Sequence, residues 1–336
     1  MILIDSTYIN NGGGRILLDY LVEVFQKQEI EVFYLFDDRC SDSFSAISKK
    51  NKIFLKASFY NRYNFYKQNQ HHYKTILCFG NIPPPIKVDA KVYTYFHQKL
   101  FLELPSGTSL KNVLIFKLKS FIWRSLKKNT DYWIVQSETM ANNLKTKLKL
   151  LSGKILVLPF YPPLSNQVVN GKREKNSFIY VSSGSAHKNH LFLINAFCSF
   201  YDKNKLGNLA VTIGKEFPLL LSLIKEKNSL GYPILNYGHL KRDQLSEIYP
   251  LYEYHIYPSL SESFGLGLLE SMENGCKIIG ANLPYTYAVC KPSITFSTSD
   301  TKSLELAFEK AERKDEEETR QMVFNEINKL VTLLQL

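Results

Sequence analysis

Long apolar runs, paired cysteines and metal-binding spacings are all missing from this 336-residue sequence. No apolar run approaches the roughly 20 residues that a membrane-spanning helix needs, and Met1–Asp5 leads straight into a strand pattern without a basic leader. The five cysteines are odd in number and scattered, which indicates reduced thiols rather than disulfides or a zinc site. We therefore expect a chain that stays in the cytoplasm and has no metal site.

The dinucleotide-binding spacing G-x-G-x-x-G is also missing from the glycine-rich loop Asn10–Arg15. This absence argues against an enzyme that uses a nicotinamide cofactor. The loop nevertheless follows the first strand and precedes a helix, where its glycines permit a positive φ and a close approach of the backbone to a ligand. We take Gly13 and Gly14 as candidate ligand contacts, and a flexible turn is the alternative.

Acidic residues are fewer than basic ones, 31 against 42, and the resulting net charge of +11 favours an anionic partner. Residues 110–129 contain six basic residues, no acidic residue and several interleaved aromatic rings. This pattern is typical of a helix lying on an anionic membrane surface, and equally of a buried amphipathic helix whose lysines face water. No recognisable nucleic-acid-binding module surrounds the segment, so nucleic acid is not an expected partner.

Short strand-like runs alternate with longer helical ones, which predicts an α/β fold with parallel sheets. The expected strands of the first half cover residues 2–4, 31–36, 75–79, 92–96, 132–136 and 154–158, and its helices cover 14–28 and 138–150. In the second half, strands are expected at 178–182, 209–213, 234–236, 254–257, 277–280 and 293–296, and helices at 190–201, 217–227, 242–251, 265–274 and 301–313.

The two halves are separated by the polar, turn-rich segment Tyr161–Asn176. We place an N-terminal Rossmann-like domain at residues 1–165 and a C-terminal Rossmann-like domain at 172–313. Residues 314–336 are expected to form a charged C-terminal helix.

The most informative stretch runs from the apolar strand at 254–257 through a glycine-containing loop into a helix. Gly265 and Gly267 would let a ligand approach the backbone, and the helix N-terminus favours a phosphate. Glu262 would lie in the loop beside this site. Glu270, about two turns into the helix, would accept hydrogen bonds from paired hydroxyls such as those of a ribose. The arrangement is suited to binding an anion and a sugar together.

Residues 271–280 continue the pattern with a helix end, Gly275 as its C-terminal cap and a buried strand. The whole unit resembles the donor-binding signature of the retaining family-four glycosyltransferases. The resemblance implies the GT-B fold, in which two Rossmann-like domains face each other across a cleft and a C-terminal helix crosses back to the first domain. It implies that Glu262 lies near the donor sugar and that Glu270 binds the ribose of the nucleotide. The further residues implied in contacts to sugar and phosphate are Ser263, Phe264, Gly265 and Leu266.

The second half opens with a strand and a loop of small residues that ends near Lys188. The lysine ammonium would lie against a diphosphate and neutralise the charge that grows on the leaving group. The resembling family has a lysine here, often with an arginine whose place this chain fills with Ser183 or His187. Lys215 in a later loop is therefore a candidate for the missing charge. Gly184 completes the expected donor loop, and a solvated lysine at a helix start is the alternative for Lys188.

His97 follows the strand at 92–96, at a position where α/β proteins place ligand contacts. The resembling family has a histidine after the corresponding strand, in contact with the donor sugar and phosphate. We therefore expect His97, Glu262 and Lys188 to be the catalytic group, although a lone histidine after a strand can also be structural.

The resemblance implies a retaining, metal-independent glycosyltransferase that moves a hexose from a nucleotide sugar to a saccharide acceptor. The basic surface suggests that this acceptor is lipid-linked, as in bacterial polysaccharide or lipopolysaccharide O-antigen assembly, and that the protein lies peripherally on the inner face of the cytoplasmic membrane. No carboxylate is obvious on the far face of the sugar, so front-face displacement is expected. Two alternatives stay open: a non-catalytic nucleotide-binding or scaffolding protein of the same fold, and a sugar-nucleotide epimerase.

Overall fold

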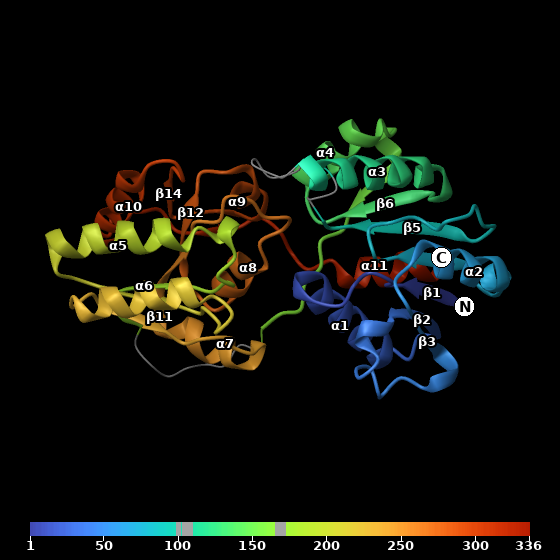
Figure 1. The fold of residues 1–336 in the computed structure, drawn as a ribbon, viewed down its shortest axis with the longest axis horizontal. Helices are drawn as coiled ribbons and strands as arrows, with labels where there is room; N and C mark the ends of the chain where they lie inside the picture. The colour runs from blue at the N-terminus through green and yellow to red at the C-terminus, as the bar shows by residue number, and fades with distance from the viewer. Residues whose placement is uncertain (99–101, 103–109, 165–172) are drawn as a thin grey trace. The chain divides into compact units, whose positions relative to one another are not determined.

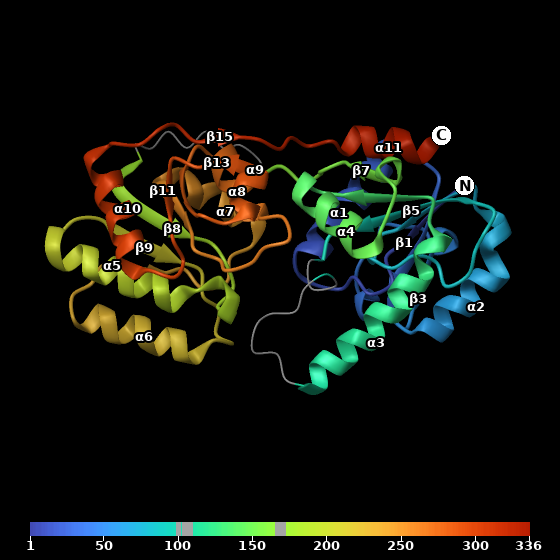
Figure 2. The same cartoon turned by 90° about the horizontal axis from the view of Figure 1, so that it is seen from above.

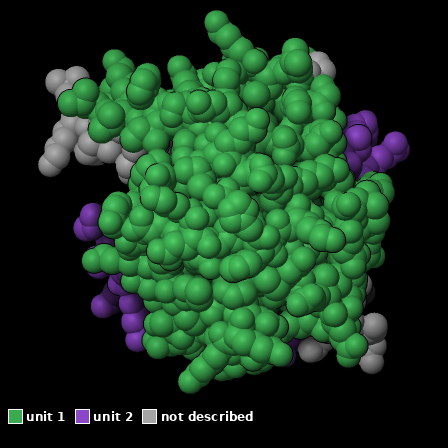
Figure 3. Space-filling view, turned by 90° about the vertical axis from the view of Figure 1, so that its right-hand side faces the viewer, with its two compact units in different colours: residues 1–162, 324–336 green, residues 163–323 purple. Residues whose placement is uncertain are grey.

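The chain folds into two compact units in the computed structural model, which describes residues 1–98, 102, 110–164 and 173–336. Unit 1 comprises Met1–Pro162 and Phe324–Leu336, and unit 2 comprises Pro163–Val323 (Figure 3). Unit 1 is therefore built from two stretches of sequence, one before and one after unit 2. Part of the linker that the sequence predicted, residues 165–172, lies outside the described residues.

Seven parallel strands of the described residues form the sheet of unit 1, in the order β3-β2-β1-β4-β5-β6-β7. They are β1 (Ile2–Asp5), β2 (Val32–Asp37), β3 (Lys52–Leu55), β4 (Thr75–Cys78), β5 (Lys91–Phe96), β6 (Tyr132–Val135) and β7 (Ile155–Val157). The strand order reverses between β1 and β4, and open parallel sheets bind ligands beyond the carboxyl ends of the strands at such a reversal. The loops that follow β1 and β4 are therefore the expected ligand-binding edge of unit 1.

The helices of unit 1 are α1 (Gly12–Lys27), α2 (Phe59–Asn69), α3 (Leu110–Leu126), α4 (Glu138–Leu148) and α11 (Ile327–Gln335). Val92 and Phe96 lie on the same face of β5, because strand side chains alternate between faces. Val92 packs in an apolar cluster with Phe65 of α2, and Phe96 packs in another with Trp123 of α3 and Leu144 of α4. Figure 1 shows α11 on the other side of the sheet from α3 and α4.

Unit 2 contains a six-stranded parallel sheet in the order β10-β9-β8-β11-β12-β14 within the described part of the chain. Its strands are β8 (Glu174–Tyr180), β9 (Asn208–Val211), β10 (Ile234–Asn236), β11 (Tyr252–Tyr257), β12 (Lys277–Ala281) and β14 (Ile294–Phe296). A small antiparallel pair, β13 (Cys290–Lys291) with β15 (Arg320–Gln321), lies apart from this sheet. The reversal of strand order falls between β8 and β11, and thus at the loops that carry Lys188 and Glu262.

The helices of unit 2 are α5 (His190–Asn204), α6 (Pro218–Ser229), α7 (Arg242–Ile248), α8 (Leu266–Glu273), α9 (Pro284–Val289) and α10 (Thr301–Arg313). Phe178 of β8 packs against Phe200 of α5 and Phe308 of α10, and these two helices lie side by side (Figure 2). The next residue, Ile179, points to the opposite face and joins a cluster with Leu245 of α7. Helices therefore cover both faces of the sheet, as in a doubly wound α/β fold.

The predicted α/β class with two parallel sheets is confirmed, and so is each predicted strand and helix in the list above, with ends shifted by a few residues. The sequence prediction missed β3, β13, α2 and α9. Residues 314–336 differ as well, because the structure has the short strand β15 and a helix only at Ile327–Gln335. Among the described residues we find no helix whose length and apolar content would allow it to span a bilayer.

Candidate functional site

Lys188 and Glu262 form an ion pair at the carboxyl edge of the unit 2 sheet. β8 and β11 are parallel neighbours, so the loops that follow them start at the same edge. Lys188 Nζ lies 2.5 Å from Glu262 Oε1, and both side chains are less than one fifth exposed. The backbone N–H of Leu260 donates to the carbonyl of His187 at 2.8 Å, which joins the two loops directly. Residues 74 positions apart are thus brought together.

Buried tyrosines hold these two loops in place. The hydroxyl of Tyr180 donates to the carbonyl of Lys188 at 3.1 Å and lies 2.9 Å from Ser259 Oγ. The hydroxyl of Tyr285 donates to the carbonyl of Ser259 at 2.6 Å. Because Tyr180 and Ser259 are fully buried, these hydrogen bonds are shielded from water and fix the backbone on both sides of the ion pair.

The N-terminus of α8 begins immediately after the loop that carries Glu262. Gly265 is its N-cap residue with a φ of 92°, in the left-handed region that favours glycine. Gly267 lies so close to β11 that a Cβ atom there would be 3.3 Å from Cε2 of Tyr257. Of the other predicted contacts, Phe264 is buried, whereas Ser263 and Leu266 are partly exposed. The first turn of α8 presents backbone N–H groups and the positive end of the helix dipole, which attract an anion.

Glu270 lies on α8 and is buried, with only 8% of its side chain exposed. Its carboxylate accepts a hydrogen bond from the guanidinium of Arg242, the first residue of α7. Burial raises the pKa of Glu270, and the nearby Arg242 opposes that rise. Arg242 was not among the residues picked out from the sequence, because its partner is 28 positions away and no local motif connects them.

The remaining predicted donor-binding residues of unit 2 differ in their surroundings. Gly184 packs against the ring of Phe217, and a side chain at position 184 would overlap that ring. Ser183 is exposed, and its hydroxyl lies 3.0 Å from that of Ser185. Lys215, in the loop after β9, is exposed at the edge of the same sheet. Close packing against Phe217 thus explains why residue 184 is glycine. For Lys215 the structure shows only its position in an exposed loop.

In unit 1 the structure brings Gly14 and His97 together. A Cβ atom on Gly14 would lie 3.0 Å from Nε2 of His97, so only glycine leaves room for the ring in this position. Gly13 is exposed in the first turn of α1. The backbone N–H of His97 donates to Oδ1 of Asn81, a buried residue that no sequence motif marks. Burial lowers the pKa of His97 to about 4, so this imidazole is neutral at pH 7.

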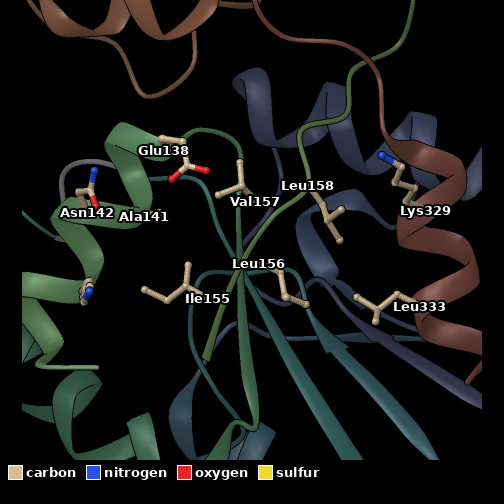
Figure 4. A pocket seen from close by; sticks show the side chains of 10 residues that line it. Glu138, Ala141, Asn142, Ile155, Leu156, Val157, Leu158, Lys329 and Leu333 are labelled. Atoms are coloured by element: carbon tan, nitrogen blue, oxygen red, sulfur yellow. The ribbon is translucent and has the colours of Figure 1, made fainter. Parts of the chain in front are cut away.

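A pocket of about 650 Å³ lies elsewhere in unit 1, between α4, β7 and α11 (Figure 4). Its floor is apolar, with Ile155, Val157 and Leu333, and charged side chains such as Glu138 and Lys329 lie at its margin. None of the candidate residues lines it. In the described part of the chain, no three His, Cys, Asp or Glu side chains are grouped in a way that would hold a metal ion.

The two Rossmann-type parallel sheets make up the GT-B fold, which the solved structures of several glycosyltransferases share. The crystal structure of WaaG, a glycosyltransferase involved in lipopolysaccharide biosynthesis, matches with a TM-score of 0.69 and 15% identity, over 99% of both chains. At this identity the likeness establishes the fold alone.

Residues 165–326, just under half of the chain, match the model of the glycosyl transferases group 1. The capsular polysaccharide biosynthesis glycosyltransferase CapH of Staphylococcus aureus is 29% identical over 159 residues, which are 45% of this chain and 42% of CapH.

A second curated relative is the GtfA subunit of a UDP-N-acetylglucosamine–peptide N-acetylglucosaminyltransferase of Limosilactobacillus reuteri. It is 32% identical over 118 residues, 34% of this chain and 22% of that protein. The chain thus matches less than half the length of either curated relative.

Proposed function

We propose that this protein is a retaining glycosyltransferase that moves a hexose from a UDP-sugar to a saccharide acceptor during the assembly of a bacterial surface polysaccharide, either a capsule or a lipopolysaccharide O-antigen. One observation carries the proposal. A lysine–glutamate pair and a buried glutamate lie on either side of a helix N-terminus, within the glycosyl transferases group 1 region. The choice of uridine rests on the name of the GtfA relative, and the polysaccharide on those of CapH and WaaG.

Each charged group has a role toward the donor in this proposal. The diphosphate binds to the ammonium of Lys188 and to the N–H groups at the start of α8, since both supply positive charge at a partly buried site. The ribose hydroxyls donate to the carboxylate of Glu270. The hexose contacts Glu262 and His97, and Lys215 supplies further positive charge near the diphosphate.

The transfer step is a front-face displacement. The acceptor oxygen bonds to the anomeric carbon as the bond from that carbon to the β-phosphate oxygen breaks, and the acceptor proton passes to the departing diphosphate. The configuration at the anomeric carbon is therefore retained. Lys188 and the dipole of α8 stabilise the charge on the leaving group, which is the task that a divalent cation performs in other transferases, so we propose that no metal is required.

The proposed acceptor is a lipid-linked saccharide, reached by a protein that lies on an anionic membrane through α3. Leu114, Leu118 and Phe121 repeat at positions i, i+4 and i+7, so they share one face of α3, and they are 71%, 62% and 72% exposed. Trp123, on the opposite side, is buried against the sheet. Exposed Lys117, next to the apolar face, adds positive charge. A bilayer with anionic head groups complements both properties.

Cosedimentation with vesicles tests the role of α3. We expect the protein to bind vesicles containing phosphatidylglycerol, with affinity falling as salt rises. The double substitution Leu118→Ser and Phe121→Ser should weaken binding at least tenfold, because each large apolar side chain contributes about 1.5–3 kcal/mol when buried. Leu219→Ser on α6, where the leucine is 86% exposed, is the matched control. Equal losses in both variants, or no binding, would contradict a membrane-facing α3.

The transferase proposal is tested with a panel of UDP-, GDP-, ADP-, CMP- and dTDP-sugars. We expect one UDP-sugar to raise the melting temperature and Glu270→Ala to abolish the shift, because a lost hydrogen bond to a charged group costs about 1.5–3 kcal/mol. Glu247→Ala, which removes an exposed carboxylate on α7, should bind as the original chain does. Product formed from a synthetic lipid-linked saccharide should keep the donor's anomeric configuration and form equally in EDTA.

The outcomes separate the proposal from its alternatives. No shift with any nucleotide sugar would favour a scaffolding protein. A changed sugar nucleotide formed without an acceptor would indicate an epimerase.

A further inference from the structure

Asn81 contacts His97 through both ends of its side-chain amide. Asn81 follows β4, is 2% exposed and has a φ of 67°, a left-handed conformation that asparagine adopts more readily than most residues. One amide atom accepts the backbone N–H of His97 at 2.7 Å. A backbone N–H only donates, so this atom must be the oxygen Oδ1, and the NH2 group necessarily faces the other way.

The NH2 group of Asn81 faces the imidazole ring, with Nδ2 3.5 Å from Nε2 of His97. An amide NH2 group only donates, so a hydrogen bond at this contact requires Nε2 to present its lone pair, with the proton of the neutral ring on Nδ1. An imidazolium would put an Nε2–H against the NH2 group. It would also put a positive charge beside Gly14 in the first turn of α1, where the helix dipole already disfavours cations.

The loop that carries Asn81 is held from two directions. The carbonyl of Asn81 accepts a hydrogen bond from the indole N–H of Trp123 at 3.0 Å. The buried guanidinium of Arg62 donates to the carbonyls of Ile82 and Pro83 at 2.8 and 2.7 Å, and its charge is balanced by Asp5 at 2.7 Å. An amide fixed in this way has little freedom to rotate, which makes Asn81 suited to set the orientation of the imidazole.

The two aromatic side chains that pack on the ring of His97 carry no charge at pH 7 and therefore do not stabilise an imidazolium. Phe79 and Tyr95 pack on His97 with ring centroids 5.3 and 5.7 Å away. Burial raises the pKa of Tyr95 well above its usual value, so that phenol is neutral. Nδ1 of His97 has no hydrogen-bond partner among the described residues. The protonated nitrogen is therefore the one without a protein acceptor.

We propose that Asn81 is a positioning residue that keeps His97 neutral with its proton on Nδ1, so that the histidine donates a hydrogen bond to an oxygen of the bound sugar nucleotide. The inference rests on the proposed function for the identity of that ligand, and its oxygen is either a sugar hydroxyl or a phosphate oxygen. A neutral donor excludes a role for His97 as a cation or as the acid that protonates the leaving group.

The test is nitrogen NMR of protein labelled with 15N-histidine, with His97 assigned by comparison with His97→Gln. At pH 7 we expect a pyrrole-type signal for Nδ1 and a pyridine-type signal for Nε2, with a titration midpoint below pH 5. A wild-type spectrum with the proton on Nε2, or with both nitrogens protonated at pH 7, would overturn the proposal. This measurement needs no ligand, and the His97→Gln variant serves only to assign the signals.

Asn81→Asp provides the matched substitution, because aspartate keeps the size of the side chain and tolerates the same φ. Its carboxylate accepts from the backbone N–H and also from an Nε2–H. We therefore expect the proton to move to Nε2 and the titration midpoint to rise by at least two pH units. Asn142→Asp on α4, which adds the same charge at an exposed position, should leave both unchanged. An unaltered tautomer in folded Asn81→Asp would also overturn the proposal.

The prediction about the tautomer of His97 and the prediction about activity can fail independently. If no sugar nucleotide binds or reacts, the proposed function falls, yet the NMR result still decides the state of His97. If the wild-type protein is active, Asn81→Asp should lower kcat/KM at least tenfold and introduce a pH dependence between pH 5 and 8. If activity in that variant is unchanged and pH-independent, Asn81 has no positioning role in the site.

Discussion

Replacing Glu262 by Gln is expected to tighten the binding of UDP about fivefold, because a diphosphate must otherwise compete with the Glu262 carboxylate for Lys188. In the structure the two charges are 2.5 Å apart and mostly buried. At an effective dielectric of about 20, Coulomb's law gives roughly 6–7 kcal/mol for the pair. Desolvation and the ordering of the side chains cancel most of this, and exposed pairs contribute about 0.2–1 kcal/mol.

We take about 1 kcal/mol for this partly buried pair, which corresponds to a factor of about five in Kd. Gln retains the shape of Glu262 and its ability to accept a hydrogen bond, so the substitution removes mainly the charge. Binding of UDP is measured by titration calorimetry at low salt. Sugar transfer should meanwhile slow, because Glu262 is predicted to contact the hexose.

A double-mutant cycle with Lys188→Met tests the reasoning. Lys188→Met alone should weaken UDP binding, and adding Glu262→Gln should then restore little, since no ammonium is left to release. The reasoning is refuted if Glu262→Gln binds UDP no more tightly than the original chain, or if its full gain persists without Lys188.

The other predictions concern one charged pair in each unit and one glycine. In Arg242→Gln, UDP binding should weaken several-fold as pH falls from 8 to 5.5. Burial already raises the pKa of Glu270, and the substitution removes the guanidinium that opposes this rise, so the carboxyl takes up a proton in this range. Calorimetry at several pH values measures the effect. Asp5→Ala should destabilise unit 1 by about 3–5 kcal/mol by leaving Arg62 buried and unpaired, measured as urea unfolding by fluorescence of the two tryptophans, both in unit 1. Gly14→Ala should lower the stability of unit 1 by roughly 1 kcal/mol and weaken the binding of the UDP-sugar, because the added methyl group would crowd the ring of His97; thermal melting and calorimetry measure the two effects.

Each of these variants has a control elsewhere in the chain. Arg313→Gln removes an exposed arginine of α10 and should leave the pH profile of UDP binding unchanged. Asp19→Ala breaks an exposed pair with Arg15 and should cost less than about 1 kcal/mol. Gly153→Ala adds a methyl group with no atom within 4 Å and should change neither stability nor binding. Equal effects in a variant and its control would contradict the structural reason given for the variant.

Local patterns were sufficient to predict most of the fold. Strands such as β11 and helices such as α10 have apolar periodicities and caps that can be read within ten to fifteen residues. α2 lacks such a pattern, since it buries an arginine with Phe65 and Tyr66 and has little apolar alternation. Its start is nevertheless marked by Ser58, whose hydroxyl accepts the N–H of Asn61 at 3.0 Å, a cap that sequence reading could have used.

The site was predictable only where its residues share a loop or helix with a motif. Lys188, Glu262 and Glu270 each stand in a recognisable strand–loop–helix context, and their functional roles stay predictions. Arg242 and Asn81 could not be found in this way. Each acquires its significance from a partner brought near by the sheet topology, Glu270 in one case and His97 in the other. Such pairings depend on the order of strands, which no single segment encodes.

The division of unit 1 into two stretches of sequence has a consequence for its synthesis. α11 buries Ile327, Leu330, Val331 and Leu334 in a unit whose other elements end at Pro162. At about 5–20 residues per second, a ribosome needs roughly 8–33 s to make the 164 residues between Pro162 and Ile327. During this interval the apolar surface that α11 will cover stays exposed on the nascent chain, while unit 2 is completed. The N-terminal unit is therefore the last to finish folding, and a chaperone that shields this surface during translation would raise the yield of native protein.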